Sequence, residues 1–193
     1  MKDTTTGKLF IVYGPSGSGK STLMAEVLKK LPGILIPIIT YTTRPARVNE
    51  IHAKDYYFIN HEDFALKQSK DYFIHVTSYL DNQYGASKAI IKDLEAGKNL
   101  ITIFDRAGAI EVKNSIPNAV LIWITAPINE LEKRLSSRYA ANPEQFASRF
   151  ALAQEDIQVE VIDKIYDYLI INSDLEKALQ DLEVIIKKEI KMN

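Results

Sequence analysis

Short apolar runs alternate with amphipathic segments along this chain. Leu9–Tyr13 is rich in β-forming residues and ends at Gly14-Pro15, so it is predicted to be a buried strand. Ser21–Leu31 carries apolar residues at helical spacing and stops at Pro32-Gly33. A second apolar run, Ile34–Ile39, follows within a few residues. Strand, helix and strand in this order predict the beginning of a parallel sheet.

The middle of the chain has shorter elements. Tyr56–Ile59 and Tyr72–Tyr79 are predicted strands, separated by a helix over His61–Lys70. Two short strands and one helix close together indicate a small lobe, inserted near residues 40–86.

After residue 86 the regular alternation returns. The predicted helices are Ser87–Glu95, Ala107–Asn114, Pro127–Ser136, Asn142–Val161 and Leu175–Ile190, and the predicted strands are Leu100–Phe104, Ala119–Thr125 and Tyr168–Ile171. No internal repeat or low-complexity tract interrupts the pattern. The pattern as a whole predicts an α/β fold with an internal insertion.

Composition narrows the class of protein and its partners. The 193 residues are 46% hydrophobic and 25% charged, which is typical of a globular domain and not of a disordered chain. The net charge of −1 gives no positive field for nucleic acid, and the apolar runs are too short to span a membrane. The chain has no cysteine, and its polar first residues lack the apolar core of a signal peptide. We therefore expect a soluble cytoplasmic protein.

A phosphate-binding loop follows the first predicted strand. The segment Gly14-Pro15-Ser16-Gly17-Ser18-Gly19-Lys20-Ser21 matches G-x-x-x-x-G-K-[ST] and leads into a predicted helix, as this motif requires. Its backbone N–H groups and the helix N-terminus attract phosphate, and Lys20 adds a full charge at the β- and γ-oxygens. Ser21 offers a hydroxyl to Mg²⁺, and Thr22 completes the predicted ATP-binding segment. The motif indicates a nucleoside triphosphate with Mg²⁺ but does not separate kinases from ATPases or GTPases, although no N-K-x-D segment supports a GTPase.

The next segment carries a resemblance. Residues 42–58 contain T-T-R-x-x-R-x-x-E followed by D-Y-x-F, in one continuous register from Thr42 to Phe58. This pattern resembles the monophosphate-binding region of guanylate kinases. The resemblance extends over nearly the whole chain, through Gln83-Tyr84-Gly85, Arg134–Arg138, Ser148-Arg149-Phe150 and Ile171–Asp174.

The resemblance implies an architecture and a set of functional residues. It implies a three-layer P-loop kinase fold, with a core over 1–39, 87–126 and 160–193, a monophosphate-binding lobe over 40–86 and a helical lid over 127–159. The acceptor-binding residues that it implies are Thr40, Arg44, Arg47, Tyr56, His75, Tyr84 and Asp105. The catalytic residues that it implies are Lys20, Arg138 and Arg149, assisted by Arg134, and it places Asn172 on the adenine side. The expected partners are nucleotides alone, and the expected assembly is a monomer or a homodimer.

The base-binding positions depart from the family's pattern. His75 stands at the position of the family's glutamate, Ile103 at that of its aspartate, and Ala86 at that of a serine or threonine. Guanine presents N–H and NH₂ donors, and His75 supplies at most one acceptor while Ile103 supplies none. GMP remains the leading acceptor on the resemblance, with another monophosphate close behind.

Two further functions stay open at this point. A ribose 1,5-bisphosphate kinase would also lack the guanine acceptors, although Asp55-Tyr56-Tyr57-Phe58 argues against it. A non-catalytic binding module with this fold would usually have an eroded phosphate loop, whereas Gly19-Lys20-Ser21 is complete.

Overall fold

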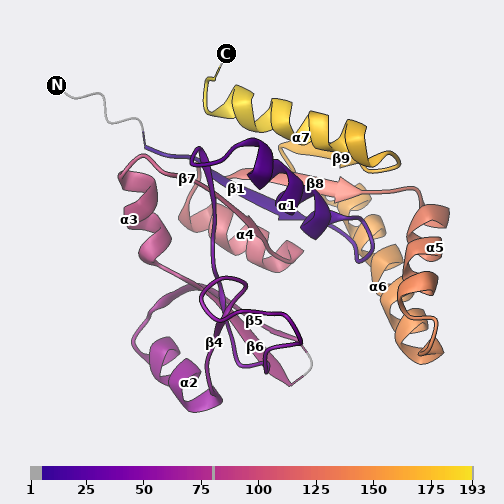
Figure 1. The fold of residues 1–193 in the computed structure, drawn as a ribbon, viewed down its shortest axis with the longest axis horizontal. Helices are drawn as coiled ribbons and strands as arrows, with labels where there is room; N and C mark the ends of the chain where they lie inside the picture. Colours follow the sequence, from indigo (N-terminus) through magenta and orange to yellow (C-terminus); the bar gives the residue numbers. More distant parts are fainter. Residues whose placement is uncertain (1–5, 80, 193) are drawn as a thin grey trace.

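A five-stranded parallel sheet forms the centre of the molecule (Figure 1). The computed structural model describes residues 6–79 and 81–192. The strand order is β2-β7-β1-β8-β9, and each neighbouring pair is parallel. The strands are β1 Leu9–Tyr13, β2 Leu35–Pro37, β7 Asn99–Ile103, β8 Val120–Thr125 and β9 Tyr168–Ile171. This arrangement confirms the predicted α/β fold, although β2 is shorter than the apolar run Ile34–Ile39.

Helices cover both faces of this sheet. On one face, α1 (Lys20–Lys30) and α7 (Leu175–Glu189) pack on Phe10 and Val12 of β1. On the other face, α3 (Ala89–Glu95) and α4 (Arg106–Ser115) pack on Leu9 and Ile11. Successive residues of β1 thus enter opposite cores, which explains its continuous apolar sequence. The resulting helix–sheet–helix layers agree with the three-layer prediction.

The inserted lobe is a mixed four-stranded sheet of order β4-β3-β6-β5, with helix α2 (His61–Ser69) beside it. Its strands are β3 Tyr41–Thr42, β4 Tyr57–Phe58, β5 Phe73–Tyr79 and β6 Asn82–Ser87. The expectation of two strands was wrong, because β3 and β6 were missed. The polar sequence of β6 shows no apolar alternation, and Ser87 ends this strand instead of beginning helix α3.

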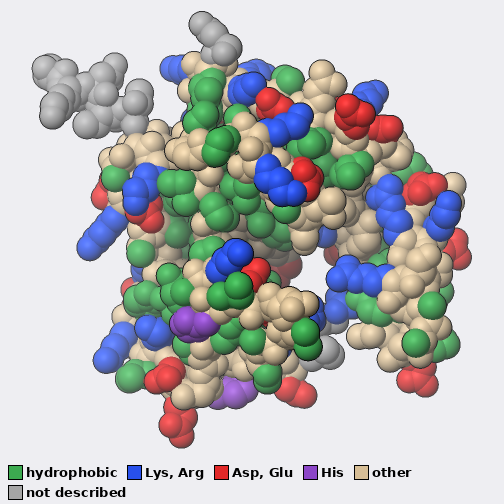
Figure 2. All heavy atoms as spheres, viewed as in Figure 1, with side chains coloured by type: hydrophobic (Ala, Val, Ile, Leu, Met, Phe, Trp, Pro, Cys, Tyr) green, Lys and Arg blue, Asp and Glu red, His purple; other side chains and the backbone are tan. Residues whose placement is uncertain are grey.

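The last two helices before β9 form an antiparallel pair. They are α5 (Ile128–Arg138) and α6 (Pro143–Ile162), and they contact each other along their length. Both predicted helices exist, and α5 extends through Arg138, two residues beyond the predicted end. Figure 2 shows open space between this pair and the inserted lobe, with Lys and Arg side chains on the side of the pair that borders it. Within the described residues, no helix has both the length and the apolar character needed to cross a membrane.

Candidate active site

The phosphate loop connects β1 to α1, as predicted. The Lys20 ammonium donates hydrogen bonds to the carbonyl oxygens of Gly14 and Pro15, each at 2.8 Å. Gly19 has φ of 90°, and a Cβ there would lie 2.3 Å from Asn172 Nδ2. Only glycine allows this backbone conformation and this close approach together.

A cavity of about 620 Å³ lies against the loop and the start of α1. It is lined by Ser16, Gly17, Gly19, Lys20, Ser21, Thr22, Arg134, Arg138, Asn172 and Leu175. Burial lowers the pKa of Lys20 from 10.5 to about 8; the charge of Asp156 opposes the shift, and that of Arg138 adds to it. Three cationic side chains therefore converge on one cavity, which suits a polyanion such as a triphosphate.

Asn172 joins the end of β9 to the loop. Its Nδ2 donates to the carbonyl of Ser18 at 2.8 Å, and its backbone carbonyl accepts from Arg134 at 2.8 Å. The side chain is 3% exposed, and its Oδ1 has no hydrogen-bond partner. Asn172 therefore supports the loop and also borders the cavity predicted for ATP.

The two predicted lid arginines lie in different surroundings. Arg138 ends α5 and lines the phosphate cavity, with its guanidinium 5.8 Å from the centre of the Tyr139 ring. Arg149 is half-buried on α6 and does not line that cavity.

On the same helix, burial raises the pKa of Asp156, and the charge of Lys20 lowers it. Sequence reasoning missed Asp156, because neighbouring acidic residues on a helix usually form a solvated face.

The loop before β4 is organised around Glu50. Its carboxylate accepts from the guanidinium of Arg44 at 2.9 Å and from the backbone N–H of Arg47 at 2.7 Å. The hydrogen bond to Glu50 raises the pKa of Arg44, whose guanidinium carbon also lies 5.6 Å from the centre of the Tyr56 ring. These contacts explain why the motif requires an acidic residue at this spacing.

The predicted phosphate-clamp residues gather here, three of them in mutual contact and the fourth, Arg47, close enough for its charge to act on Tyr56. Tyr56 and Tyr84 contact each other edge to face, with centroids 6.1 Å apart, and burial raises the pKa of Tyr56. Arg44 is near both rings. Arg47 is exposed.

A smaller cavity of about 120 Å³ lies between the lobe and the segment that joins the end of β7 to the start of α4. Its walls are Thr40, Tyr56, His75, Thr77, Tyr84, Gly85, Ala86, Ile103, Phe104 and Asp105. All the predicted acceptor-binding residues line it except Arg44 and Arg47. On the wall of this cavity, Thr77 Oγ1 donates a hydrogen bond to Asp105 Oδ2 at 2.8 Å. The other carboxylate oxygen, Asp105 Oδ1, caps α4 by accepting from the N–H of Gly108.

His75 lines the same cavity from β5. It is 6% exposed, and its Nδ1 lies 2.5 Å from Oε2 of Glu111 on α4. A register shift between Phe73 and His75 gives β5 one extra residue ahead of His75, which pairs with Ala86. Sequence reasoning did not identify Glu111, because no local pattern links it to a residue 36 positions earlier.

A second set of missed residues joins three elements beneath the site. Glu160 of α6 is 4% exposed and accepts from the Tyr13 hydroxyl at 2.7 Å, from Arg106 at 3.1 Å and from the N–H of Ile165. Tyr13 directly precedes the phosphate loop, and Arg106 directly follows Asp105. Glu160 therefore connects α6 to both halves of the candidate site.

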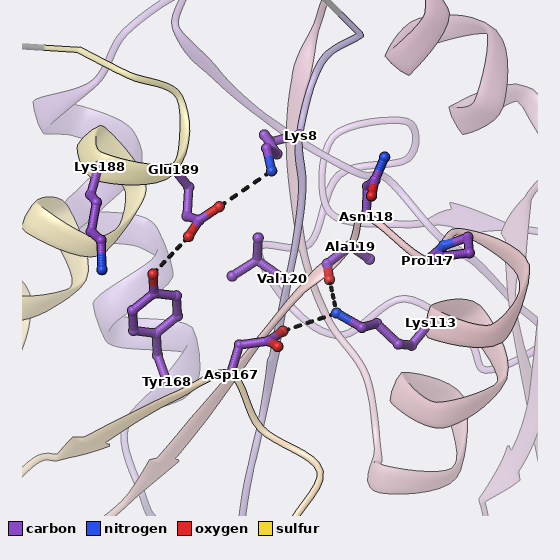
Figure 3. A pocket seen from close by; sticks show the side chains of 10 residues that line it. All are labelled: Lys8, Lys113, Pro117, Asn118, Ala119, Val120, Asp167, Tyr168, Lys188 and Glu189. Atoms are coloured by element: carbon purple, nitrogen blue, oxygen red, sulfur yellow. Dashed lines mark hydrogen bonds and ion pairs between the residues drawn. The ribbon is translucent and has the colours of Figure 1, made fainter.

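Another cavity, of about 490 Å³, opens at the opposite edge of the sheet (Figure 3). Four of its charged side chains form two pairs, Lys8 with Glu189 and Lys113 with Asp167, and Lys113 also donates to the carbonyl of Ala119. The fifth, Lys188, lies over the ring of Tyr168. The strands that border it begin there, whereas open α/β sheets bind ligands where their strands end. Ion pairs engage most of these groups, so the candidate active site is the one at the carboxyl edge of the sheet.

Comparisons with known proteins agree with this geometry. A family model described as guanylate kinase matches residues 6–189. Guanylate kinases of Shewanella and Escherichia coli are each 36% identical to this chain, over 96% and 95% of it and 89% and 88% of their own lengths. The crystal structure of guanylate kinase from Anaplasma phagocytophilum superposes with a TM-score of 0.76 at 25% identity, covering 96% of this chain and 87% of that one. This chain belongs to the guanylate kinase family.

Proposed function

We propose that this protein transfers the γ-phosphoryl group of ATP to GMP, giving GDP and ADP. The single observation that carries the proposal is the presence of two cationic sites, one at the carboxyl edge of the parallel sheet and one in the inserted lobe. One is the phosphate loop with Lys20, Arg134 and Arg138, and the other is Arg44 with its two tyrosines. A hydrolase needs only the first site, whereas a phosphotransferase with a phosphate-bearing acceptor needs both.

In the proposed complex, ATP occupies the larger cavity and the acceptor the smaller one. The loop from Gly14 to Ser21 holds the triphosphate, and Arg44, Arg47, Tyr56 and Tyr84 hold the acceptor's phosphate through charge-assisted hydrogen bonds. Arg47 is exposed, and its charge already acts on the clamp residue Tyr56. An acceptor-phosphate oxygen is already anionic and attacks in line without a general base.

The division of the chain follows from these roles. We assign residues 40–86 to the acceptor-binding lobe, 127–159 to the lid, and 1–39, 87–126 and 160–193 to the core. Lid closure would bring Arg138 and Arg149 to the transferring group, where charge spreads over the phosphoryl oxygens. Closure would also exclude water, which otherwise hydrolyses ATP.

The residues at the loop suit Mg²⁺. Ser21 is an exposed hydroxyl on the wall of the larger cavity, and Asp105, the N-cap of α4, lies on the wall of the acceptor cavity. Mg²⁺ in such sites keeps several waters and takes only one or two protein oxygens, so this donor set is sufficient. When bound with ATP, the ion neutralises phosphate charge. We further infer that the protein works in the cytoplasm, with nucleotides as partners, as a monomer or a homodimer.

A coupled assay for ADP release tests the proposal. The purified chain receives Mg·ATP and, separately, each common nucleoside monophosphate and ribose 1,5-bisphosphate. We expect GMP-dependent ADP release that is lost in Lys20→Ala and kept in Lys29→Ala, an exposed lysine of the same helix. Release with the sugar bisphosphate alone, or ATP binding without transfer to any acceptor, would refute the assignment.

A further inference from the structure

One face of α6 lies against the strand that leads into the phosphate loop. On this face Ala153 is fully buried, and Glu160 is 4% exposed and accepts from the Tyr13 hydroxyl at 2.7 Å. Asp156 stands between them at helical spacing, three residues after Ala153 and four before Glu160. Because Tyr13 ends β1 directly before Gly14, this face brings Asp156 to the edge of the sheet where the loop begins.

Asp156 is a half-buried carboxylate without a direct partner. Among the residues that the structure describes, it makes no hydrogen bond and no ion pair. Burial raises its pKa, the charge of Lys20 opposes this shift, and the charges of Glu155 and Asp105 add to it, while Arg106 lowers the pKa. The folded chain therefore holds the ionised form less readily than the unfolded chain, so at neutral pH this carboxylate lowers the unfolding free energy. Its place at the loop needs a reason other than stability.

Lys20 has partners both inside and outside the loop. Its ammonium donates to the carbonyl oxygens of Gly14 and Pro15, each at 2.8 Å, and Ser18 Oγ lies 3.5 Å away. These short-range bonds must be given up when the ammonium turns to the phosphoryl oxygens. The attraction between Lys20 and Asp156 needs no direct contact and falls only with the reciprocal of distance, so it persists through this exchange.

The anchoring of α6 keeps Asp156 in place. Glu160 also accepts from Arg106 at 3.1 Å and from the N–H of Ile165 at 2.9 Å, so this end of the helix is tied to the core. Asp156 lies about 6 Å along the helix from this anchor, whereas Arg149, on the same face, lies about 16 Å from it. A rotation of α6 about the anchor moves Arg149 much farther than Asp156. Lid closure can thus carry the arginine while the carboxylate stays beside the loop.

We propose that Asp156 is the positioning residue of Lys20. The proposal rests on the proposed function and adds to the transfer site a fixed negative charge that acts on the lysine and not on the substrate. A carboxylate repels phosphate, so Asp156 does not serve the binding of ATP itself. Its contribution belongs to the transfer step, in which Lys20 must follow the phosphoryl group.

Steady-state kinetics separate positioning from a structural role. At about pH 6.5, below the pKa of about 8 that burial gives Lys20, the lysine keeps its charge. Asp156→Asn keeps the size of the side chain and removes its charge, so kcat should fall by about 5- to 20-fold while the KM for ATP falls or stays within about threefold. Loss of packing alone would instead raise the KM for both substrates.

Two further variants test whether the charge is responsible. Asp156→Glu should keep kcat within about threefold, because a long-range attraction does not depend on a fixed hydrogen-bond geometry. Glu155→Gln removes the same charge one residue away, at an exposed position, and should match the unaltered chain. An unchanged kcat in Asp156→Asn, or an equal loss in Asp156→Glu, would overturn the proposal.

A double-mutant cycle measures the pair without turnover. Urea unfolding at the same pH compares the unaltered chain, Asp156→Asn, Lys20→Met and the double variant. Each charge is less costly in the presence of the other, so Asp156→Asn should raise the unfolding midpoint more in the Lys20→Met background than in the unaltered chain. Equal shifts in the two backgrounds would overturn this inference while leaving the proposed function intact. Absence of turnover with every acceptor would instead refute the proposed function, and the positioning role would fall with it.

Discussion

Replacing Lys20 with methionine should stabilise the nucleotide-free protein while it removes activity. Burial lowers the pKa of Lys20 from 10.5 to about 8. A difference of one pKa unit corresponds to about 1.4 kcal/mol, so holding the charged form at pH 7 costs about 3 kcal/mol relative to the unfolded chain. Loss of the hydrogen bonds to Gly14 and Pro15 offsets part of this gain, which leaves an expected increase of about 1–2 kcal/mol in unfolding free energy.

The same shift sets the pH dependence of stability. Between about pH 8 and pH 10.5 the unfolded chain keeps the lysine proton that the folded chain has lost. The unfolding free energy of the unaltered protein therefore rises with pH through this window relative to Lys20→Met, and the difference between the two proteins narrows. The kcat/KM of the unaltered enzyme for ATP should fall above about pH 8 as free Lys20 loses its charge.

Urea unfolding followed by fluorescence measures these differences. The single tryptophan, Trp123, is 4% exposed and packs on Tyr13, so its emission reports loss of the core. Lys29→Met, on the exposed side of the same helix, is the control and should show neither the gain nor the pH dependence. If Lys20→Met is less stable at pH 7, or if its difference from the unaltered protein is constant from pH 7 to 10, the buried-cation argument is wrong.

Three other predictions concern the rest of the site. Arg44→Ala should raise the KM for GMP by about 10- to 100-fold with little change in the KM for ATP, because it removes a charged donor from the acceptor's phosphate alone; equal effects on both substrates in steady-state kinetics would contradict this. Asn172→Ala removes the contact with Ser18 and should raise the KM for ATP but not that for GMP; an unchanged KM for ATP would show that the loop keeps its shape unaided. Glu160→Ala removes the buried carboxylate that accepts hydrogen bonds from Arg106 and Tyr13. Urea titration should therefore show an unfolding free energy lower by about 3–5 kcal/mol. A loss below about 1 kcal/mol would show that water replaces the carboxylate.

The elements that sequence reasoning placed correctly are those whose own residues carry a strong signal, either a continuous apolar run or an apolar helix face. β1 enters two cores and is apolar throughout, and the helix after it has an apolar face and a motif at its start. The phosphate loop was predictable because its function resides in consecutive backbone groups. By contrast, β3 has two residues and β6 is polar, so only their pairing in the folded lobe makes them strands. Their identity depends on partners that a local pattern does not contain.

Side chains that act through distant partners were also beyond local reasoning. Glu160, Asp156 and Glu111 stand on helices where isolated carboxylates are ordinary surface residues. Each becomes informative only when the fold brings it to Tyr13, Lys20 or His75. Of these three contacts, the sequence pointed to only one partner, His75, because a histidine stands there in place of the glutamate expected from the resemblance.

The contrast explains why the reaction was easier to predict than the base. Phosphates are bound by loop amides and by guanidinium groups whose spacing is written in contiguous motifs, and any phosphate presents the same charge to them. A base is distinguished by single donors and acceptors, and the polar contacts near the smaller cavity join distant segments: His75 of β5 contacts Glu111 of α4, and Thr77 of β5 bonds Asp105. Because these contacts join segments that are far apart in the sequence, a local pattern identifies the residues expected at the phosphates but not those that meet the base.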